Sequence, residues 1–242
     1  MMDKYINQYG VITPKDMYDF DNKSIKLGIT SLELMENAGR AVSDNIRKNY
    51  KKSHVLVICG NGNNAGDGFV VAKNLREANW PVKVMLINDT VFSKDTSSML
   101  ERWGKNDLIK YSIDEIYSAE IIVDAIFGSG LNRPLNSFNL EVVSSINASK
   151  AKVISIDLPS GVNGETGDIL NSAVIADSTV TFVRKKIGHL LLPGKQFCGE
   201  VYVENIGTQK SIIENFKFNY FENNPNIWSK GIKLPNLYSH KY

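Results

Sequence analysis

HVLVICGNGNNAGDGFVVAKNLREANW (54–80) decides the fold class. Its first part, HVLVICG (54–60), is a short β-branched run that ends in glycine, which is typical of a buried strand. Its second part, GDGFVVAKNLREANW (66–80), has small and apolar residues recurring at helical spacing, on one face: Gly68, Val71, Ala72, Leu75 and Ala78. A strand followed at once by such a helix predicts one β–α unit of an α/β protein.

The same alternation continues along the chain. Two helices come first, one starting at Thr13 and the other at the capping box Thr30-x-x-Glu33, with its end near Tyr50. Further strands are predicted at 82–88, 120–128, 152–161, 178–183 and 200–207, and further helices at 92–105 and 137–148. Apolar strands separated by helix-length segments predict a mostly parallel sheet covered on both faces. Such sheets bind ligands beyond the carboxyl ends of their strands.

Composition limits the class of function. The 242 residues include 28 basic and 26 acidic side chains, so the net charge of +2 provides no basic field for nucleic acid. The two cysteines, Cys59 and Cys198, have neither a zinc-binding spacing nor a disulfide framework. The apolar runs are far shorter than the ~18 residues of a membrane span. MMDKYINQYG at the start has no apolar signal segment. We therefore expect a cytoplasmic protein that binds neither nucleic acid nor membranes.

The first of three unusual loops is GNGNNAGDG (60–68). Gly60, Gly62 and Ala65 fit G-x-G-x-x-[GA], which lets backbone N–H groups approach a phosphate at a helix N-terminus. A tight turn that merely needs glycine is the alternative. The loop also carries four polar side chains, more than a turn requires: Asn61, Asn63, Asn64 and Asp67.

The second and third loops each begin with a carboxylate at a strand end. DAIFGSGLNRP (124–134) has Asp124 inside an apolar strand, where burial is costly unless the carboxylate is paired or bound to a cation. SIDLPSGVNGETG (155–167) has Asp157 at a strand end, with Ser160 just beyond. A loop cap and an Asx-turn are the respective alternatives. Arg133 either pairs with a phosphate or is solvated.

Together the loops should bring four oxygen-bearing side chains to one edge of the sheet: Asn64, Asp124, Asp157 and Ser160. Neutral oxygens plus a carboxylate suit a hard cation. A second carboxylate is then free for proton transfer. These residues predict a nucleotide-like ligand, a cation and a carboxylate acid or base, but they do not name the substrate.

Five motifs in this order resemble the NAD(P)H-hydrate epimerase family over residues 10–210. They are LMENAGRAV (34–42), GNGNNAGDG (60–68), VDAIFGSGLNRP (123–134), DLPSGVNGETG (157–167) and ADSTVTFVRKKIGHLLLPGK (176–195). The resemblance implies a three-layer α/β/α, Rossmann-like fold with a mostly parallel central sheet. It also implies a homodimer, one potassium ion, no redox cofactor, and hydrated NADH or NADPH (NADHX or NADPHX) as substrate.

The resemblance also implies the site residues. It assigns the potassium ion to Asn64, Asp124 and Ser160. It assigns the substrate to Asn63, Asn64, Ala65, Gly66, Asp67, Gly128, Ser129, Gly130, Leu131, Asn132, Arg133, Pro134, Asp157 and Lys186. The register around Lys186 departs from the usual family form, which leaves its role open. Ala65 stands where the family commonly has glycine, so its methyl group is tolerated only if the backbone there avoids positive φ.

The chain divides, on this reading, into an epimerase domain at 1–210 and a linker at 211–242. LPNLYSHKY (234–242) resembles the opening of the ADP-dependent NAD(P)H-hydrate dehydratase domain. We therefore expect this chain to be the N-terminal part of a longer protein with two activities, with a dehydratase, fused or separate, as partner. A plain surface tail is the alternative.

The implied reaction removes a hydroxyl from the nicotinamide ring and returns it to the opposite face. We expect Asp157 to act as the acid and then as the base, with a pKa raised by partial burial. One rival is a nicotinamide-dependent oxidoreductase, with Asp89 as the ribose-binding acid. The other rival is a non-catalytic interaction module on the same fold.

Overall fold

A parallel sheet forms the centre of the computed structural model, which describes residues 7–87 and 92–231. Its seven strands have the order β4-β3-β2-β5-β6-β7-β8, and every neighbouring pair is parallel. The strands are β2 (Val55–Cys59), β3 (Val82–Leu86), β4 (Leu108–Ile109), β5 (Ile121–Ala125), β6 (Lys152–Ile156), β7 (Ser178–Phe182) and β8 (Glu200–Glu204). The predicted parallel sheet is confirmed.

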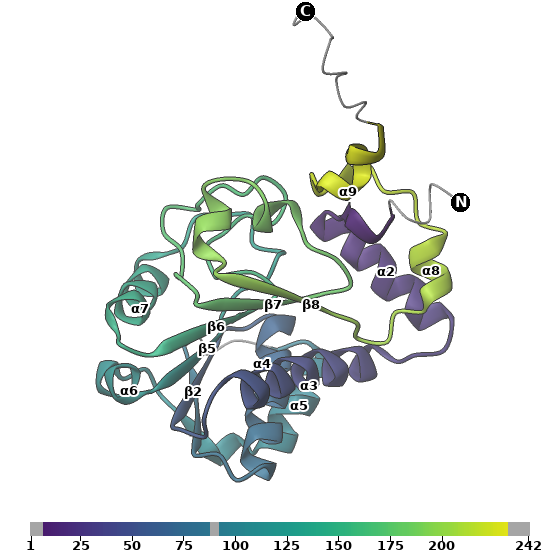
Figure 1. Cartoon of the computed structure of the whole chain (residues 1–242). Coiled ribbons are helices and arrows are strands. Elements are labelled where there is room, and N and C mark those ends of the chain that lie inside the picture. The colour runs from purple at the N-terminus through teal and green to yellow at the C-terminus, as the bar shows by residue number, and fades with distance from the viewer. Residues whose placement is uncertain (1–6, 88–91, 232–242) are drawn as a thin grey trace, which may run out of the picture.

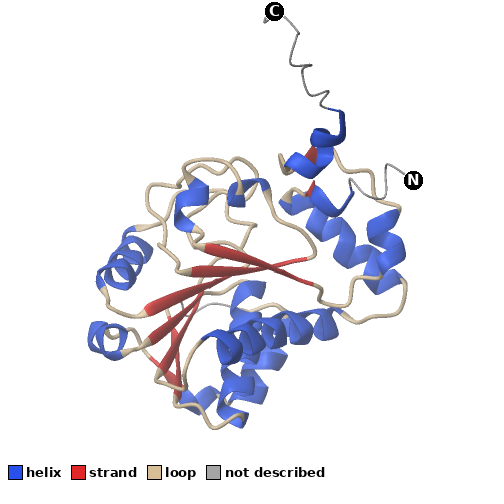
Figure 2. Ribbon diagram, in the orientation of Figure 1, coloured by secondary structure: helices blue, strands red, loops and turns tan. Residues whose placement is uncertain are grey.

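Helices cover both faces of this sheet (Figures 1 and 2). One face packs against α2 (Pro14–Lys26), α3 (Ser31–Asn49), α4 (Asn63–Glu77) and α5 (Lys94–Trp103), and the other against α6 (Ile113–Ser118) and α7 (Ser137–Ala148). Strand β2 serves both layers, because Val55, Val57 and Cys59 join the first core cluster while Leu56 and Ile58 join the second. The three-layer α/β/α fold is confirmed.

The predicted helix starts are confirmed by their caps. Thr13 and Thr30 are the N-caps of α2 and α3, and each forms a reciprocal capping box, with Asp16 and Glu33 respectively. Helix α4 starts at Asn63, with Gly62 as N-cap, earlier than the predicted start at 66. Most of the first polar loop is therefore the first turn of a helix, which aims its free N–H groups at the sheet edge.

Other boundaries differ because the chain turns sharply after the strands. Strands β5 and β6 end at Ala125 and Ile156, several residues before the predicted ends. Strand β4 and helix α6 were not predicted, because two and six residues are too few for a clear period. Residue 88 of the predicted strand 82–88 lies outside the described residues.

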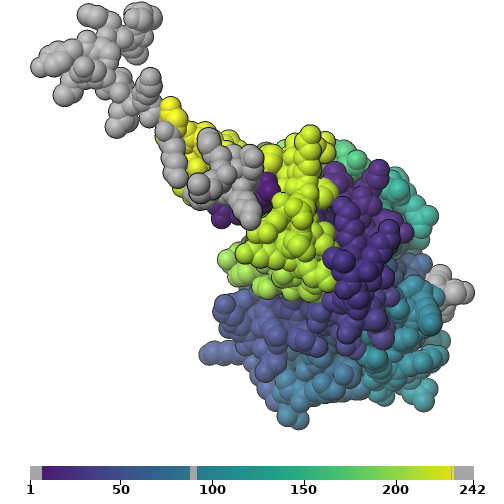
Figure 3. All heavy atoms as spheres, turned by 90° about the vertical axis from the view of Figure 1, so that its right-hand side faces the viewer, coloured from purple at the N-terminus to yellow at the C-terminus, as the bar shows by residue number. Residues whose placement is uncertain are grey.

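The ends of the described chain meet beside α2. Strand β1 (Gly10–Val11) pairs antiparallel with β9 (Tyr220–Phe221), and α8 (Lys210–Glu214) lies against α2. Figure 3 shows this yellow-green segment covering the purple N-terminal part. Ile212 and Phe218 belong to the main core cluster. Helix α9 (Pro225–Trp228) follows, and short 3₁₀ turns lie at Asn7–Tyr9, Lys105–Asp107, Ile187–His189, Gly194–Phe197 and Ser229–Gly231. The boundary at residue 210 stays a prediction.

None of the helices within residues 7–87 and 92–231 has both the length and the apolar character of a transmembrane span.

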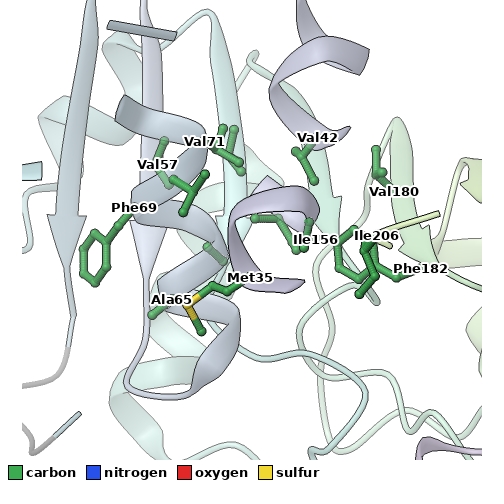
Figure 4. Packing of buried hydrophobic residues seen from close by; sticks show 14 of the residues in the cluster. Met35, Val42, Val57, Ala65, Phe69, Val71, Ile156, Val180, Phe182 and Ile206 are labelled. Atoms are coloured by element: carbon green, nitrogen blue, oxygen red, sulfur yellow. The ribbon is translucent and has the colours of Figure 1, made fainter. Parts of the chain in front are cut away.

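Helix α4 packs very closely on the sheet (Figure 4). Ala65 and Phe69 are fully buried in this layer, between the sheet and α3. A Cβ atom at Gly68 would lie 2.6 Å from the Ala125 Cβ and 3.0 Å from the Cys59 Sγ. Only glycine allows this approach, since the neighbouring atoms belong to two central strands.

We expect Gly68→Ala to lower the free energy of unfolding by about 1–3 kcal/mol, because the added methyl group overpacks the core. Gly130→Ala is the control, since a Cβ there meets nothing within 4 Å, and it should change stability by less than about 1 kcal/mol. Urea denaturation of both variants measures the difference. Equal stabilities would contradict the close packing of α4.

Candidate active site

A cavity of about 660 Å³ opens at the carboxyl ends of the central strands. It lies where the strand order reverses between β2 and β5, the place where open α/β sheets bind ligands. Its walls come from α2, α3, the first turn of α4 and the loop after β5, with Asp157 among them. Its volume is in the range of pockets for small-molecule ligands and cofactors.

Most predicted substrate-binding residues line this cavity: Asn63, Asn64, Asp67, Gly128, Ser129, Gly130, Leu131, Asn132, Arg133 and Asp157. Ala65, Gly66, Pro134 and Lys186 are not on its wall. Ala65 is buried within α4 and does not have positive φ, so its methyl group fits a helical backbone. Asp89 lies outside the described residues, as does LPNLYSHKY (234–242).

Asp157 is held by a compact set of donors at the end of β6. Its Oδ1 lies 2.7 Å from the Lys186 Nζ and accepts a hydrogen bond from the Thr181 hydroxyl at 3.0 Å. Its Oδ2 accepts from the Ser129 backbone N–H at 2.9 Å. Lys186 is fully buried and also donates to Thr181 and to the Phe182 carbonyl. Lys186, whose role the sequence left open, therefore forms a buried ion pair with Asp157.

This ion pair reverses the expected ionisation of Asp157. Burial by itself raises the pKa of the Asp157 carboxyl, but the Lys186 ammonium and the hydrogen bonds from Lys186 and Ser129 bring the pKa well below its usual range. The expectation of a raised Asp157 pKa is wrong, because sequence reasoning did not pair the two residues. An ionised Asp157 suits a base better than an acid.

His189, which sequence reasoning missed, fixes the backbone of this pair. Its Nδ1 accepts from the Lys186 backbone N–H at 2.9 Å, and its Nε2–H donates to the Asp157 carbonyl at 2.7 Å. Burial, followed by the nearby Lys186 charge, lowers the pKa of His189 to about 4, so the ring is neutral. Asp157 has the uncommon φ of 65°, which this contact supports. The only sequence signal for His189 as a site residue was its position three residues after Lys186.

Asp124 is fully buried at the end of β5 and is hydrogen-bonded on both oxygens. The Ser160 hydroxyl and backbone N–H donate to it at 2.5 and 2.8 Å, and the Ser155 hydroxyl at 2.9 Å. Burial raises the pKa of Asp124, and these hydrogen bonds oppose that shift. The predicted contact between Asp124 and Ser160 is present, and Ser155 is an unpredicted third partner.

The oxygen groups of Asn64, Asp124 and Ser160 have the chemistry to hold a monovalent cation, although Asp124 and Ser160 are not on the cavity wall. Asn64 is only 7% exposed. Its Oδ1 and the Asp157 Oδ2 both lie near Gly128. The Asn64 Nδ2 has no hydrogen-bond partner within the described residues. One carboxylate with amide and hydroxyl oxygens is a donor set for a hard, weakly charged ion. The described residues hold no cluster of three His, Cys, Asp or Glu side chains, which a transition metal would favour.

Three further aspartates line the cavity, Asp21, Asp67 and Asp95, and the pKa of two of them is raised. Burial raises the pKa of Asp67 well above its usual value, and the charges of Asp157 and Asp21 add to the rise. Burial also raises the pKa of Asp21 to about 6; Lys186 opposes the rise and Asp157 adds to it. Asp21 was not predicted as a site residue, because an aspartate on an amphipathic helix is usually a solvated one.

The chain is similar to several known proteins. The family model described as YjeF-related protein N-terminus matches residues 31–188. The NAD(P)H-hydrate epimerase of Lentilactobacillus buchneri is 36% identical, over 88% of this chain and 98% of that protein. The NAD(P)H-hydrate epimerase of Oenococcus oeni is 38% identical, over 81% of this chain and 96% of that protein.

Two other comparisons concern a longer relative and a solved structure. The bifunctional NAD(P)H-hydrate repair enzyme Nnr of Thermofilum pendens is 36% identical over 83% of this chain, which spans 40% of that relative's length. The crystal structure of yeast ynu0 has the same fold, with a TM-score of 0.68 at 22% identity, over 81% of this chain and 86% of the yeast chain. NAD(P)H-hydrate epimerases match this chain along nearly their whole length. This chain therefore belongs to the YjeF-related N-terminal family.

Proposed function

We propose that the protein is an NAD(P)H-hydrate epimerase, an isomerase that interconverts the R and S forms of NADHX and NADPHX. The observation that carries this proposal is the single cavity in which Asn64, Asp67 and Asp157 meet a glycine turn at the start of α4. Epimerase relatives that align along nearly their whole length support the same activity.

The substrate's phosphates would lie at the N-terminus of α4. The N-cap Gly62 makes no side-chain cap, so the first N–H groups of the helix are free to receive an anion. Ser129 and Gly130 in the facing loop line the same cavity, with Arg133 at its exposed rim. The Ser129 backbone N–H is committed to Asp157, so this loop also positions the carboxylate.

The reaction proceeds through a cationic ring. The ring nitrogen expels the hydroxyl once a proton converts it to water, and water then returns to the opposite face. The ionised Asp157 stabilises the positive charge that develops on the ring and accepts the proton of the returning water. No hydride moves, so the nicotinamide's oxidation state is unchanged.

A potassium ion would be held by Asn64, Asp124 and Ser160. When bound, the ion supplies positive charge for an anionic part of the substrate and offsets the buried Asp124 carboxylate. Ser155 and the Ser160 backbone N–H orient that carboxylate toward the site.

The biological setting follows from the same assignment. We infer a cytoplasmic homodimer that works with an ADP-dependent NAD(P)H-hydrate dehydratase, fused or separate. Residues 1–210 would form the epimerase domain, and 211–242 a linker toward that dehydratase. The bifunctional relatives, of which the chain spans 40%, support this arrangement.

The purified chain should convert one epimer of NADHX into the other, as followed by chromatography. Asp157→Asn should slow the exchange by about 10²–10⁴-fold, because it removes the charge and the base. A change in nicotinamide absorbance during turnover would instead indicate an oxidoreductase. Absence of any exchange by the folded wild type would favour a non-catalytic interaction module.

Lys186→Met should lower the free energy of unfolding at pH 7 by about 3–5 kcal/mol, because it leaves Asp157 charged without its partner. Lys185→Met is the matched control, since its ion pair with Glu222 is partly exposed, at 27% and 35%. That control should cost at most about 1 kcal/mol. Chemical denaturation compares the two, and equal losses would rule out a special role for the buried pair.

Ser155→Ala should raise the potassium concentration needed for half-maximal activity by about 10–100-fold, because Asp124 loses one orienting hydrogen bond. Ser178→Ala, a buried serine at the amino end of β7, is the control and should leave that concentration unchanged. Activity titrated with KCl, at an ionic strength held constant with tetramethylammonium chloride, measures the effect. An unaltered titration for Ser155→Ala would argue against a cation at Asp124.

A further inference from the structure

Helix α2 presents a carboxyl group to the cavity that the mechanism above leaves without a role. Asp21 lies one turn after Met17, and both side chains line the cavity wall. Met17 and Phe20, which precede Asp21 on the helix, belong to the core cluster and anchor the helix next to this position. Asp21 is half-buried rather than solvated.

One oxygen of this carboxyl is buried without a partner. The Asp21 Oδ1 makes no hydrogen bond to any described residue. Several buried polar atoms share that condition, but among the residues that line the cavity they belong to Asp21 and Asn64. An unsatisfied oxygen at the wall of a binding site is expected to find its partner in the ligand.

Burial favours a proton on this carboxyl, against the pull of a nearby positive charge. Three groups act on Asp21: Lys186 from beyond β7, Asp157 from the end of β6, and Asp67 from α4. Lys186, which is paired with Asp157, lowers the pKa of Asp21, and Asp157 raises it by a smaller amount. With burial as the main cause, the pKa of Asp21 rises to about 6, far from that of the ionised Asp157. Two carboxyls separated in this way can divide the work of an acid and a base.

Resting on the proposed function, we propose that Asp21 is the catalytic acid that protonates the hydroxyl leaving the hydrated nicotinamide ring. The carbon–oxygen bond breaks, its electron pair leaves with the protonated oxygen as water, and the ring nitrogen's lone pair forms the cationic ring. Water then bonds to the opposite face and gives its proton to Asp157. Asp157 releases that proton to solvent in the open cavity and solvent returns one to Asp21, so the protons balance and no oxidant or reductant is needed.

Asp67 is the other carboxyl on the cavity wall whose pKa is raised, so it could also supply this proton. It lies just after the first turn of α4, close to the N–H groups that would receive the substrate's phosphates. A neutral carboxyl there serves phosphate binding by avoiding repulsion. Asp21 is therefore the better placed acid, and Asp67→Asn becomes an arm of the test.

The test compares Asp21→Asn with Asp19→Asn, an identical change on the same helix outside the cavity wall. Asp21→Asn should lower kcat for epimer exchange by about 10²–10⁴-fold with little change in KM. In the wild type, kcat should decline as pH rises above about 6, the pKa of Asp21, because its proton is lost. That decline should vanish in Asp21→Asn, and Asp21→Glu and Asp19→Asn should retain it.

Thermal stability separates a catalytic from a structural role. The folded-state pKa of Asp21 lies above its ordinary value, so wild-type stability is lost as pH rises from about 4 to about 6. Asp21→Asn should therefore raise Tm at pH 7.5 and leave it unchanged near pH 4. A lower Tm at pH 7.5, or a kcat within about threefold of wild type, would overturn the proposal.

Two further outcomes are distinct. Loss of the pH-dependent decline in Asp67→Asn, with the decline kept in Asp21→Asn, would overturn the proposal in favour of Asp67. A wild type without epimer exchange would contradict the proposed function itself, and the Tm comparison would then still report whether Asp21 is buried at a cost.

Discussion

The buried ion pair between Asp157 and Lys186 is the interaction on which the site depends. Lys186 has no exposed surface, and its ammonium reaches Asp157, the Thr181 hydroxyl and the Phe182 carbonyl together. Such a pair adds little net stability compared with apolar residues, but either charge left alone would be very costly. It therefore locks the ends of β6 and β7 to the 3₁₀ turn that carries His189, and it keeps one carboxylate ionised in a largely apolar surrounding.

Four carboxyls at this edge of the sheet differ because their partners differ. Asp124 is hydrogen-bonded by two serines and Asp157 is paired with a lysine, while burial dominates at Asp21 and Asp67. Residue type alone assigns all four the same chemistry. Because their environments differ, these carboxyls can take different roles in the proposed mechanism: Asp124 as a cation ligand, Asp157 as the base and Asp21 as the acid.

Local rules predicted much of the fold and part of the site. The apolar strands, the capping boxes at Thr13 and Thr30, and the loops after β2, β5 and β6 were readable because each depends on adjacent residues. The ionised state of Asp157 could not be predicted, because Lys186 is distant in sequence and the sequence around Lys186 departs from the usual family form. Asp21 was missed for a related reason: helical periodicity does not tell whether a polar face meets solvent or a cavity.

The position of Asp21 depends on the far end of the described chain. The Phe20 and Phe216 rings lie 4.7 Å apart, Lys23 lies 5.6 Å above Phe216, and β9 pairs with β1 just before α2. These contacts add to those of the main cluster, to which Phe20 belongs and against which Phe216 packs. The rigidity that the proposed acid needs is therefore supplied in part by residues beyond 210, which the sequence alone assigns to a linker. In the proposed mechanism the sheet carries the base and the residues that would hold the cation, and α2, held by both ends of the described chain, carries the acid.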